Sequence, residues 1–232
     1  MTRLLYINSS PRGEKSESNR IAGVFLAAYL PGAPDVEVDT LDLWDGSLPG
    51  YYGRGVEAKM NALAGKDPVG AAAKAWADVQ RVFARFVAAD EYLFTVPMWN
   101  HGVPWILKHF IDTVSQRGML FDLDSETGYT GRLGGRRAMV VFTSGVWAPD
   151  RAPEFGTDFH SNYFLDWLRL GGITDVDVAR FQPNLMSAEV DANRRAAEQQ
   201  ARDAAARWVP PRRIAALTAV RPAREISVRS HL

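Results

Sequence analysis

Two short polar stretches, each set between an apolar run and a helical pattern, constrain the fold of this chain most. The first, residues 8–19 (NSSPRGEKSESN), follows the apolar run 4–7. The second, residues 95–104 (TVPMWNHGVP), overlaps the end of the apolar run 92–96. A loop between a strand and a helix offers free backbone N–H groups, and the helix dipole there favours an anion. Two such loops at one edge of a parallel sheet predict a cleft for a phosphorylated ligand.

The first stretch lacks the signatures of dinucleotide and nucleoside-triphosphate loops. Its one glycine, Gly13, does not make G-x-G-x-x-G, and no G-K-[ST] is present. Three hydroxyls, on Ser10, Ser16 and Ser18, suit a single terminal phosphate instead, which indicates a mononucleotide. The alternative is that these serines only cap the helix that begins near Asn19.

Hydrophobic periodicity predicts five strands that alternate with helices. The strands are expected at 4–8, 36–41, 91–96, 138–143 and 176–181. The helices are expected at 18–29, 70–88, 104–116, 162–170 and 188–208. This alternation predicts an α/β domain with a parallel sheet and right-handed crossovers.

The segments between these elements are read as follows. Residues 46–68 are glycine-rich, hold a possible short helix at 56–64, and are expected to lie over the domain or against a partner subunit. Residues 118–133 and 144–160 are expected to be loops. The chain is therefore predicted to form one domain over residues 1–209, followed by an irregular tail at 210–232.

Composition excludes several classes of chemistry. The 27 basic residues match the 27 acidic ones, so an extended nucleic-acid surface is not expected. There is no cysteine, which excludes disulfides, thiolate nucleophiles and thiolate metal sites. The four histidines, which share no metal-ligand spacing, are His101, His109, His160 and His231. No G-x-S-x-G elbow, signal peptide or transmembrane-length run is found, so we expect a cytoplasmic protein without a metal site.

The order of motifs resembles one known family. The motifs, over residues 3–181, are Ser9-Ser10, Ser16-Glu17-Ser18-Asn19, Pro97-Met98-Trp99-Asn100, Phe121 ahead of Gly128, and Thr143-Ser144-Gly145. This set resembles the FMN-dependent NADH-azoreductases, which are flavodoxin-like reductases of quinones and azo dyes. The resemblance implies a five-stranded parallel sheet in the order 2-1-3-4-5, with helices on both faces and the cleft between strands 1 and 3.

The resemblance also implies a set of cofactor-binding residues. Those for the FMN phosphate are Ser10, Ser16, Glu17 and Ser18, with Glu17 contributing its backbone N–H. Those along the flavin edge are Met98, Trp99, Asn100 and His101, and those of a third contact are Ser144, Gly145, Val146 and Trp147. Trp99 stands where the family commonly has Tyr, and Val146-Trp147 are expected to crowd the third contact. Phe121 is implied to bind substrate over the flavin of a neighbouring subunit in a homodimer.

Each of these residues has a simpler reading. Met98 and Trp99 could belong to the core, and Asn100 could cap the helix at 104–116. His101 could be solvated, and Phe121 could pack its own loop.

The implied activity needs no catalytic acid or base from the protein. FMN would accept a hydride from NADH or NADPH and pass two electrons to a quinone or azo compound by a ping-pong mechanism. The alternatives are a flavodoxin-type electron carrier and a scaffold without flavin whose tail binds an acidic partner. The arginines of that tail are Arg212, Arg213, Arg221, Arg224 and Arg229. The sequence leaves open the natural acceptor and the choice between NADH and NADPH.

Overall fold

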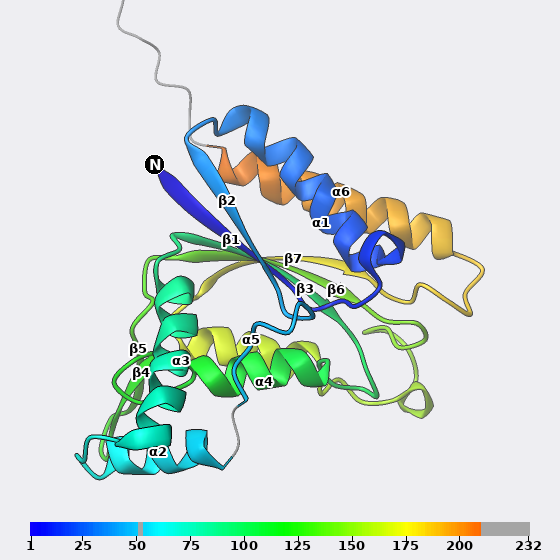
Figure 1. Cartoon of the computed structure of the whole chain (residues 1–232). Coiled ribbons are helices and arrows are strands. Elements are labelled where there is room, and N and C mark those ends of the chain that lie inside the picture. Colours follow the sequence, from blue (N-terminus) through cyan, green and yellow to red (C-terminus); the bar gives the residue numbers. More distant parts are fainter. Residues whose placement is uncertain (51–52, 210–232) are drawn as a thin grey trace, which may run out of the picture.

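The computed structural model describes residues 1–50 and 53–209, so the predicted tail at 210–232 lies outside the described residues. Its centre is a parallel sheet of five strands in the order β2-β1-β3-β6-β7 (Figure 1). These strands are β1 (Thr2–Asn8), β2 (Val36–Asp42), β3 (Glu91–Pro97), β6 (Arg137–Thr143) and β7 (Asp175–Phe181). The predicted order 2-1-3-4-5 is confirmed. Only the numbering differs, because two short strands intervene in the chain.

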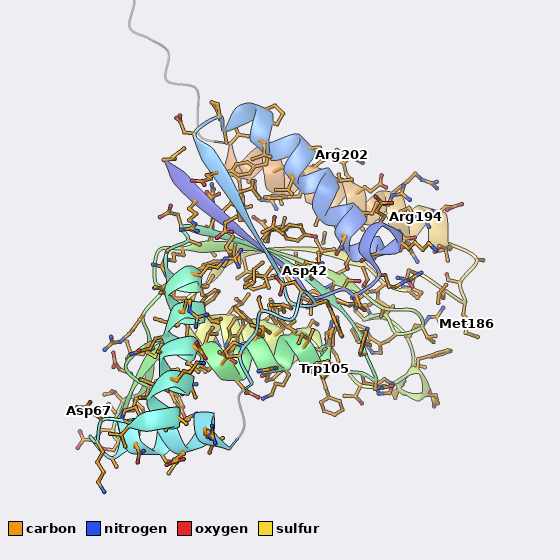
Figure 2. All side chains as sticks on the ribbon, viewed as in Figure 1. Asp42, Asp67, Trp105, Met186, Arg194 and Arg202 are labelled. Carbon is orange, nitrogen blue, oxygen red and sulfur yellow. The ribbon has the colours of Figure 1, made fainter. Side chains whose placement is uncertain are left out.

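Helices cover both faces of this sheet (Figure 1). On one face lie α1 (Glu17–Tyr29) and α6 (Val190–Trp208), and on the other lie α3 (Gly70–Val87), α4 (Trp105–Val114) and α5 (Ser161–Leu170). The central strand β3 is buried along almost its whole length, as expected for a parallel strand covered on both faces. Side chains fill the space between the sheet and both helical layers (Figure 2).

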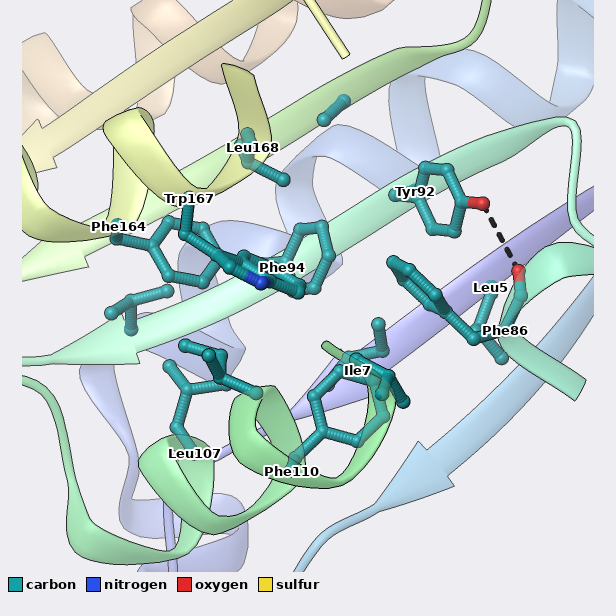
Figure 3. Packing of buried hydrophobic residues seen from close by; sticks show 14 of the residues in the cluster. Leu5, Ile7, Phe86, Tyr92, Phe94, Leu107, Phe110, Phe164, Trp167 and Leu168 are labelled. Atoms are coloured by element: carbon teal, nitrogen blue, oxygen red, sulfur yellow. Dashed lines mark hydrogen bonds between the residues drawn. The ribbon is translucent and has the colours of Figure 1, made fainter. Parts of the chain in front are cut away.

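The two cores differ in composition. On the face of the sheet that α3, α4 and α5 cover, large aromatic side chains from these helices and from β3 pack together (Figure 3). In this core the hydroxyl of Tyr92 donates to the carbonyl of Phe86 at 3.0 Å, so the buried phenol has a partner. On the other face, α6 presents Ala197, Ala201 and Ala204, whose small side chains allow close packing with α1.

A small arm extends away from the sheet. It consists of α2 (Arg54–Leu63), the start of α3, and the antiparallel hairpin of β4 (Phe121–Asp124) and β5 (Gly128–Gly131) (Figure 1). The short helix expected at 56–64 is present as α2, and it packs against α3 of the same domain.

The expectation of a plain loop at 118–133 is wrong. The hairpin forms because Asp124 closes its turn by accepting the N–H groups of Glu126 and Thr127 at 2.9 and 2.8 Å, and Gly128 takes a φ of +83°. Two strands of four residues each give too short an alternation to be seen in the sequence pattern.

Candidate functional site

The loops that follow β1 and β3 meet at one edge of the sheet. In the strand register Asn8 pairs with Thr95, and Pro97 pairs with Thr143. The carboxyl ends of β1, β3 and β6 therefore lie side by side. The prediction that the two polar stretches share an edge is confirmed.

Buried hydrogen bonds fix the first loop to the second strand. The Ser9 hydroxyl donates to the carbonyl of Thr95, and the Ser9 N–H donates to Oγ1 of Thr95 at 3.3 Å. The Thr95 hydroxyl in turn donates to Oδ1 of Asn8 at 3.2 Å, and the same oxygen accepts from the N–H of Ser10 at 3.0 Å. The start of the loop is thus held rigidly before any ligand binds.

The rest of the first loop forms an anion-binding arrangement at the N-terminus of α1. Ser16 caps the helix by accepting from the N–H of Asn19 at 3.2 Å, and its hydroxyl lies 3.0 Å from that of Ser18. Both serines are buried, as is Ser10. Within residues 1–50 and 53–209, the N–H groups of Glu17 and Ser18 have no partner, as expected in a first helical turn. These donors and the helix dipole favour a bound anion.

The second loop contains a tight turn with a constrained backbone. Trp99 and Gly102 exchange two backbone hydrogen bonds, of 2.8 and 2.9 Å. Between them Asn100 and His101 have positive φ angles of 47° and 67°, as in a type I′ turn. Positive φ is uncommon for residues other than glycine, although Asn and His adopt it more often than most, and such conformations cluster at functional sites. The N–H groups of Asn100 and His101 have no partner among the described residues, so the turn presents two donors at its tip.

Two of the simpler readings of this loop, that Asn100 caps a helix and that Trp99 belongs to the core, are wrong. The N-cap of α4 is Pro104 and no side chain caps that helix, so Asn100 does not act as its cap. Trp99 is 37% exposed and therefore is not a core residue, whereas Met98 is half-buried and its N–H donates to the carbonyl of Thr143 at 2.7 Å.

His101 is exposed, and its ring lies against Gly156. A Cβ at Gly156 would lie 2.5 Å from Cε1 of His101, so a side chain there would displace the ring from this position.

The third predicted contact is the loop that follows β6, and hydrogen bonds hold this loop in place. The Ser144 hydroxyl donates to the carbonyl of Trp147, so it is already engaged within the loop. The carbonyls of Ser144 and Gly145 accept from the N–H groups of Asn184 and Leu185, both at 2.8 Å. The N–H groups of Gly145 and Val146 have no partner in the part of the chain that the structure describes. The loop therefore offers backbone donors.

Phe121 is not brought together with the other predicted residues. It begins β4, and its ring packs edge-on against that of Tyr129 at 5.2 Å. The hairpin lies at the opposite end of the molecule from the loops after β1 and β3 (Figure 1). Within one chain, Phe121 therefore packs its own hairpin.

A third element contributes a residue that sequence reasoning missed. Trp44 follows β2, and its indole N–H donates to the carbonyl of Ser9 at 2.9 Å. Its ring lies 5.7 Å from that of Trp99 and 5.5 Å from that of Trp105. The available signal was an aromatic residue directly after the strand that neighbours β1 in the implied sheet order.

An open pocket of about 440 Å³ adjoins this tryptophan cluster. Its lining residues are Trp99, Asn100, Gly102, Val103, Trp105, Lys108, Phe159 and Tyr163. Four of these eight residues are aromatic, so the pocket suits a flat apolar molecule.

Among residues 1–50 and 53–209, no three His, Asp or Glu side chains gather as a metal site would require. No described helix combines the length and the apolar character needed to cross a membrane.

The sheet order and the ligand loops at its switch point define a flavodoxin-like protein. The family model described as having a flavodoxin-like fold matches residues 2–205. The chain is 45% identical to the FMN-dependent NADH:quinone oxidoreductase of Ruegeria pomeroyi, over 83% of this chain and 94% of that protein. It is 39% identical to the protein of that name in Desulfotalea psychrophila, over 80% and 87% of the two chains. The chain belongs to this family of FMN-dependent NADH:quinone oxidoreductases, which confirms the resemblance.

Solved structures show the same fold. An azoreductase from Bacillus anthracis str. Sterne superposes with a TM-score of 0.81 at 23% identity and covers 90% of this chain and all of its own. A FMN-dependent NADH-azoreductase from Bacillus anthracis str. Ames Ancestor, in complex with FMN, gives a TM-score of 0.80 at 22% identity, again with coverage of 90% and 100%.

Proposed function

We propose that this protein binds FMN and transfers two electrons from NADH or NADPH to quinones or aromatic azo compounds. The observation that carries the proposal is the meeting of two donor-rich loops at one sheet edge, in a chain that belongs to a family of FMN-dependent NADH:quinone oxidoreductases. One loop is built for a terminal phosphate, and the other presents a rigid turn beside aromatic side chains.

The residues present fit FMN. The unpartnered N–H groups of Glu17 and Ser18, with the buried hydroxyls of Ser10, Ser16 and Ser18, would hold the phosphate. A mononucleotide needs no glycine-rich approach for a pyrophosphate, in keeping with this loop. The residues proposed for the ring system are Met98, Trp99, Asn100, His101, Ser144, Gly145, Val146 and Trp147.

When bound, FMN supplies the hydride acceptance and the two-electron chemistry. The protein supplies position and electrostatics. The N–H groups of Asn100 and His101 are fixed by the two hydrogen bonds that close their turn, so they need no reorganisation to stabilise negative charge beside them. The rings of Trp44, Trp99 and Trp105 pack against one another beside the turn. No side chain is assigned as a catalytic acid or base.

We assign the nicotinamide and the acceptor to one shared place, which gives ping-pong kinetics. Support comes from the pocket beside Trp99 and Asn100, whose aromatic walls suit flat rings of either kind. Parallel lines in double-reciprocal plots of rate against NADH at several quinone concentrations would agree with this order. Intersecting lines would refute it.

A homodimer accounts for the exposed apolar side chains. Those of the arm include Val56, Met60, Leu123 and Tyr129, and those near the site include Trp105, Phe159, Leu185 and Met186. In a two-fold dimer, the arm of each chain would pack onto the site of the other. Both groups of exposed side chains would then be buried, in two equivalent contacts. Phe121, on the hairpin of the arm, would then contribute to the substrate site of the neighbouring subunit. The single domain at 1–209 and the cytoplasmic location stay predictions.

The test is direct. The purified protein should be yellow or should take up FMN, and it should oxidise NADH in the presence of a benzoquinone. A parallel assay with NADPH measures the nucleotide preference, and an azo dye tests the second acceptor class. A colourless protein that binds no FMN would refute the proposal. A protein that binds FMN but accepts no hydride from either nucleotide would be an electron carrier instead.

A further inference from the structure

Buried polar atoms without partners gather at the start of α1. Over the described ranges, six buried side-chain nitrogen or oxygen atoms lack a hydrogen-bond partner, and three of them are Oε2 of Glu17, Oδ1 of Asn19 and Nε of Arg194. An unpartnered buried polar group costs about 1–3 kcal/mol, so such atoms are scarce and their clustering is informative. The first two lie in the first turn of α1, within the polar stretch 8–19, whereas Arg194 comes from α6.

Arg194 of α6 lies beside the start of α1, although it is 177 residues away from Glu17 in the sequence (Figure 2). Its Nη2 donates to Oε1 of Glu17 at 3.4 Å, and its Nη1 donates to Oδ1 of Asp191 at 2.8 Å. The guanidinium lies 5.2 Å from the centre of the Phe181 ring, at the end of β7. The side chains of Arg194 and Glu17 are only 25% and 29% exposed, whereas that of Asp191 is 78% exposed. The less hydrated of its two ion pairs is therefore the one with Glu17.

The charge of Glu17 conflicts with a phosphate site. A carboxylate in the first turn of α1 is favoured by the helix dipole, but it repels a dianion held by the N–H groups of that same turn. Because the Glu17–Arg194 pair is partly shielded from water, this repulsion is not removed by solvent alone. A cation next to the carboxylate offsets its charge, and the other partner of Arg194, Asp191, is largely solvated.

We infer that Arg194 is a positioning residue for the cofactor phosphate: it neutralises Glu17 and draws that carboxylate toward α6, so that the start of α1 accepts a dianion. The inference rests on the proposed function, since it concerns the phosphate of FMN. It extends the phosphate site to a residue on the last helix of the described chain.

The chain offers a matched control. Arg20 of α1 pairs with Glu198 of α6 at 3.1 Å, so it joins the same two helices farther along from the loop. If Arg194 only clamps α1 to α6, then R20Q should have the same effect on cofactor binding as R194Q. If Arg194 acts through charge at the phosphate, R20Q should bind FMN like the wild type.

The experiment is a fluorescence titration of the apoprotein with FMN and with riboflavin, which lacks the phosphate. R194Q should weaken FMN binding roughly tenfold and leave riboflavin binding unchanged, because only FMN carries the dianion. R194K should retain most of the FMN affinity. E17Q should bind FMN more tightly than the wild type, and E17Q in the R194Q background should recover the lost affinity. The difference between R194Q and wild type should shrink as salt is raised.

The outcomes separate the possibilities. Equal losses for FMN and riboflavin, or an equal loss in R20Q, would show a helix clamp and overturn the inference. FMN binding in R194Q as tight as in the wild type would overturn it too, and would leave the proposed function intact. If R194Q fails to fold, as judged by circular dichroism, E17Q decides: unchanged or weaker FMN binding by E17Q would overturn the inference. A wild type that binds no FMN would refute the proposed function itself.

Discussion

Acid should destabilise this protein through one buried histidine. His160 stands before α5 and is fully buried, with Nε2 within 2.9 Å of the carbonyl of Val96. Its Nδ1 has no hydrogen-bond partner among the described residues. Burial lowers the pKa of His160 from 6.5 to about 4, against the partial opposition of the nearby Asp158 carboxylate.

The sign and size follow from linkage. The folded-state pKa lies below the unfolded value, so the unfolded chain binds the proton more readily between pH 6.5 and 4. Stability should therefore be complete above that window and fall as the pH drops through it. With pKa values of 6.5 and about 4, the loss is about 2 kcal/mol from pH 7 to pH 5 and about 3 kcal/mol by pH 4.

Urea unfolding at several pH values, followed by tryptophan fluorescence, measures this loss. His160→Gln is the informative variant, because its amide can still donate to Val96 but does not titrate. The wild type should lose about 2 kcal/mol more than H160Q between pH 7 and pH 5, whatever their stabilities at pH 7. Other titrating groups act in both proteins, so they largely cancel in the difference. Parallel pH profiles would refute the reasoning.

Three further predictions, the first with a control variant, can be tested by urea unfolding. Gly131→Ala would place a Cβ 2.1 Å from the backbone nitrogen of Gly172, so it should lower the free energy of unfolding by about 1–3 kcal/mol or more. The control is Gly134→Ala, whose Cβ meets nothing within 4 Å and which should be nearly neutral. Glu91→Gln removes the carboxylate that Arg137 pairs with beside a buried Tyr29 hydroxyl, and should cost about 3 kcal/mol. Trp44→Phe loses the indole hydrogen bond to the first loop and should cost about 1 kcal/mol.

The sheet and its order could be predicted because each central strand is a continuous apolar run followed by turn residues. Because segments with a strand period alternate with segments with a helix period, few topologies remain possible. The place of the ligand cleft then follows from the strand order. The hairpin at 121–131 could not be predicted in this way, because its strands are short and their packing partner is distant in the sequence. The close approach of Gly131 to the backbone of Gly172 has no sequence signature beyond the glycines themselves.

The candidate site divides along the same line. The loops after β1 and β3 carry local signals, namely clustered hydroxyls and a turn between a strand and a helix. Trp44 reaches its loop only because Asp42 of β2 pairs with Asn8 of β1. Arg194 is one of several arginines on an alanine-rich helix, and periodicity alone does not tell which of them faces α1. The cofactor roles of the loop residues themselves stay predictions.

The two ends of the proposed site rest on different physics, and this makes their roles separable. At the start of α1 the important groups are charges and donors, so substitutions there should alter the affinity for a phosphorylated cofactor and should respond to salt. At the 99–102 turn the important groups are fixed backbone N–H donors and aromatic walls, which salt hardly affects. A change such as Trp99→Ala should therefore weaken FMN and riboflavin binding alike and lower turnover with quinone, with little dependence on salt, whereas R194Q should weaken the binding of FMN alone. If the two variants changed FMN affinity, riboflavin affinity and salt dependence alike, the site would act as one unit, and the division into a phosphate end and a ring end would be wrong.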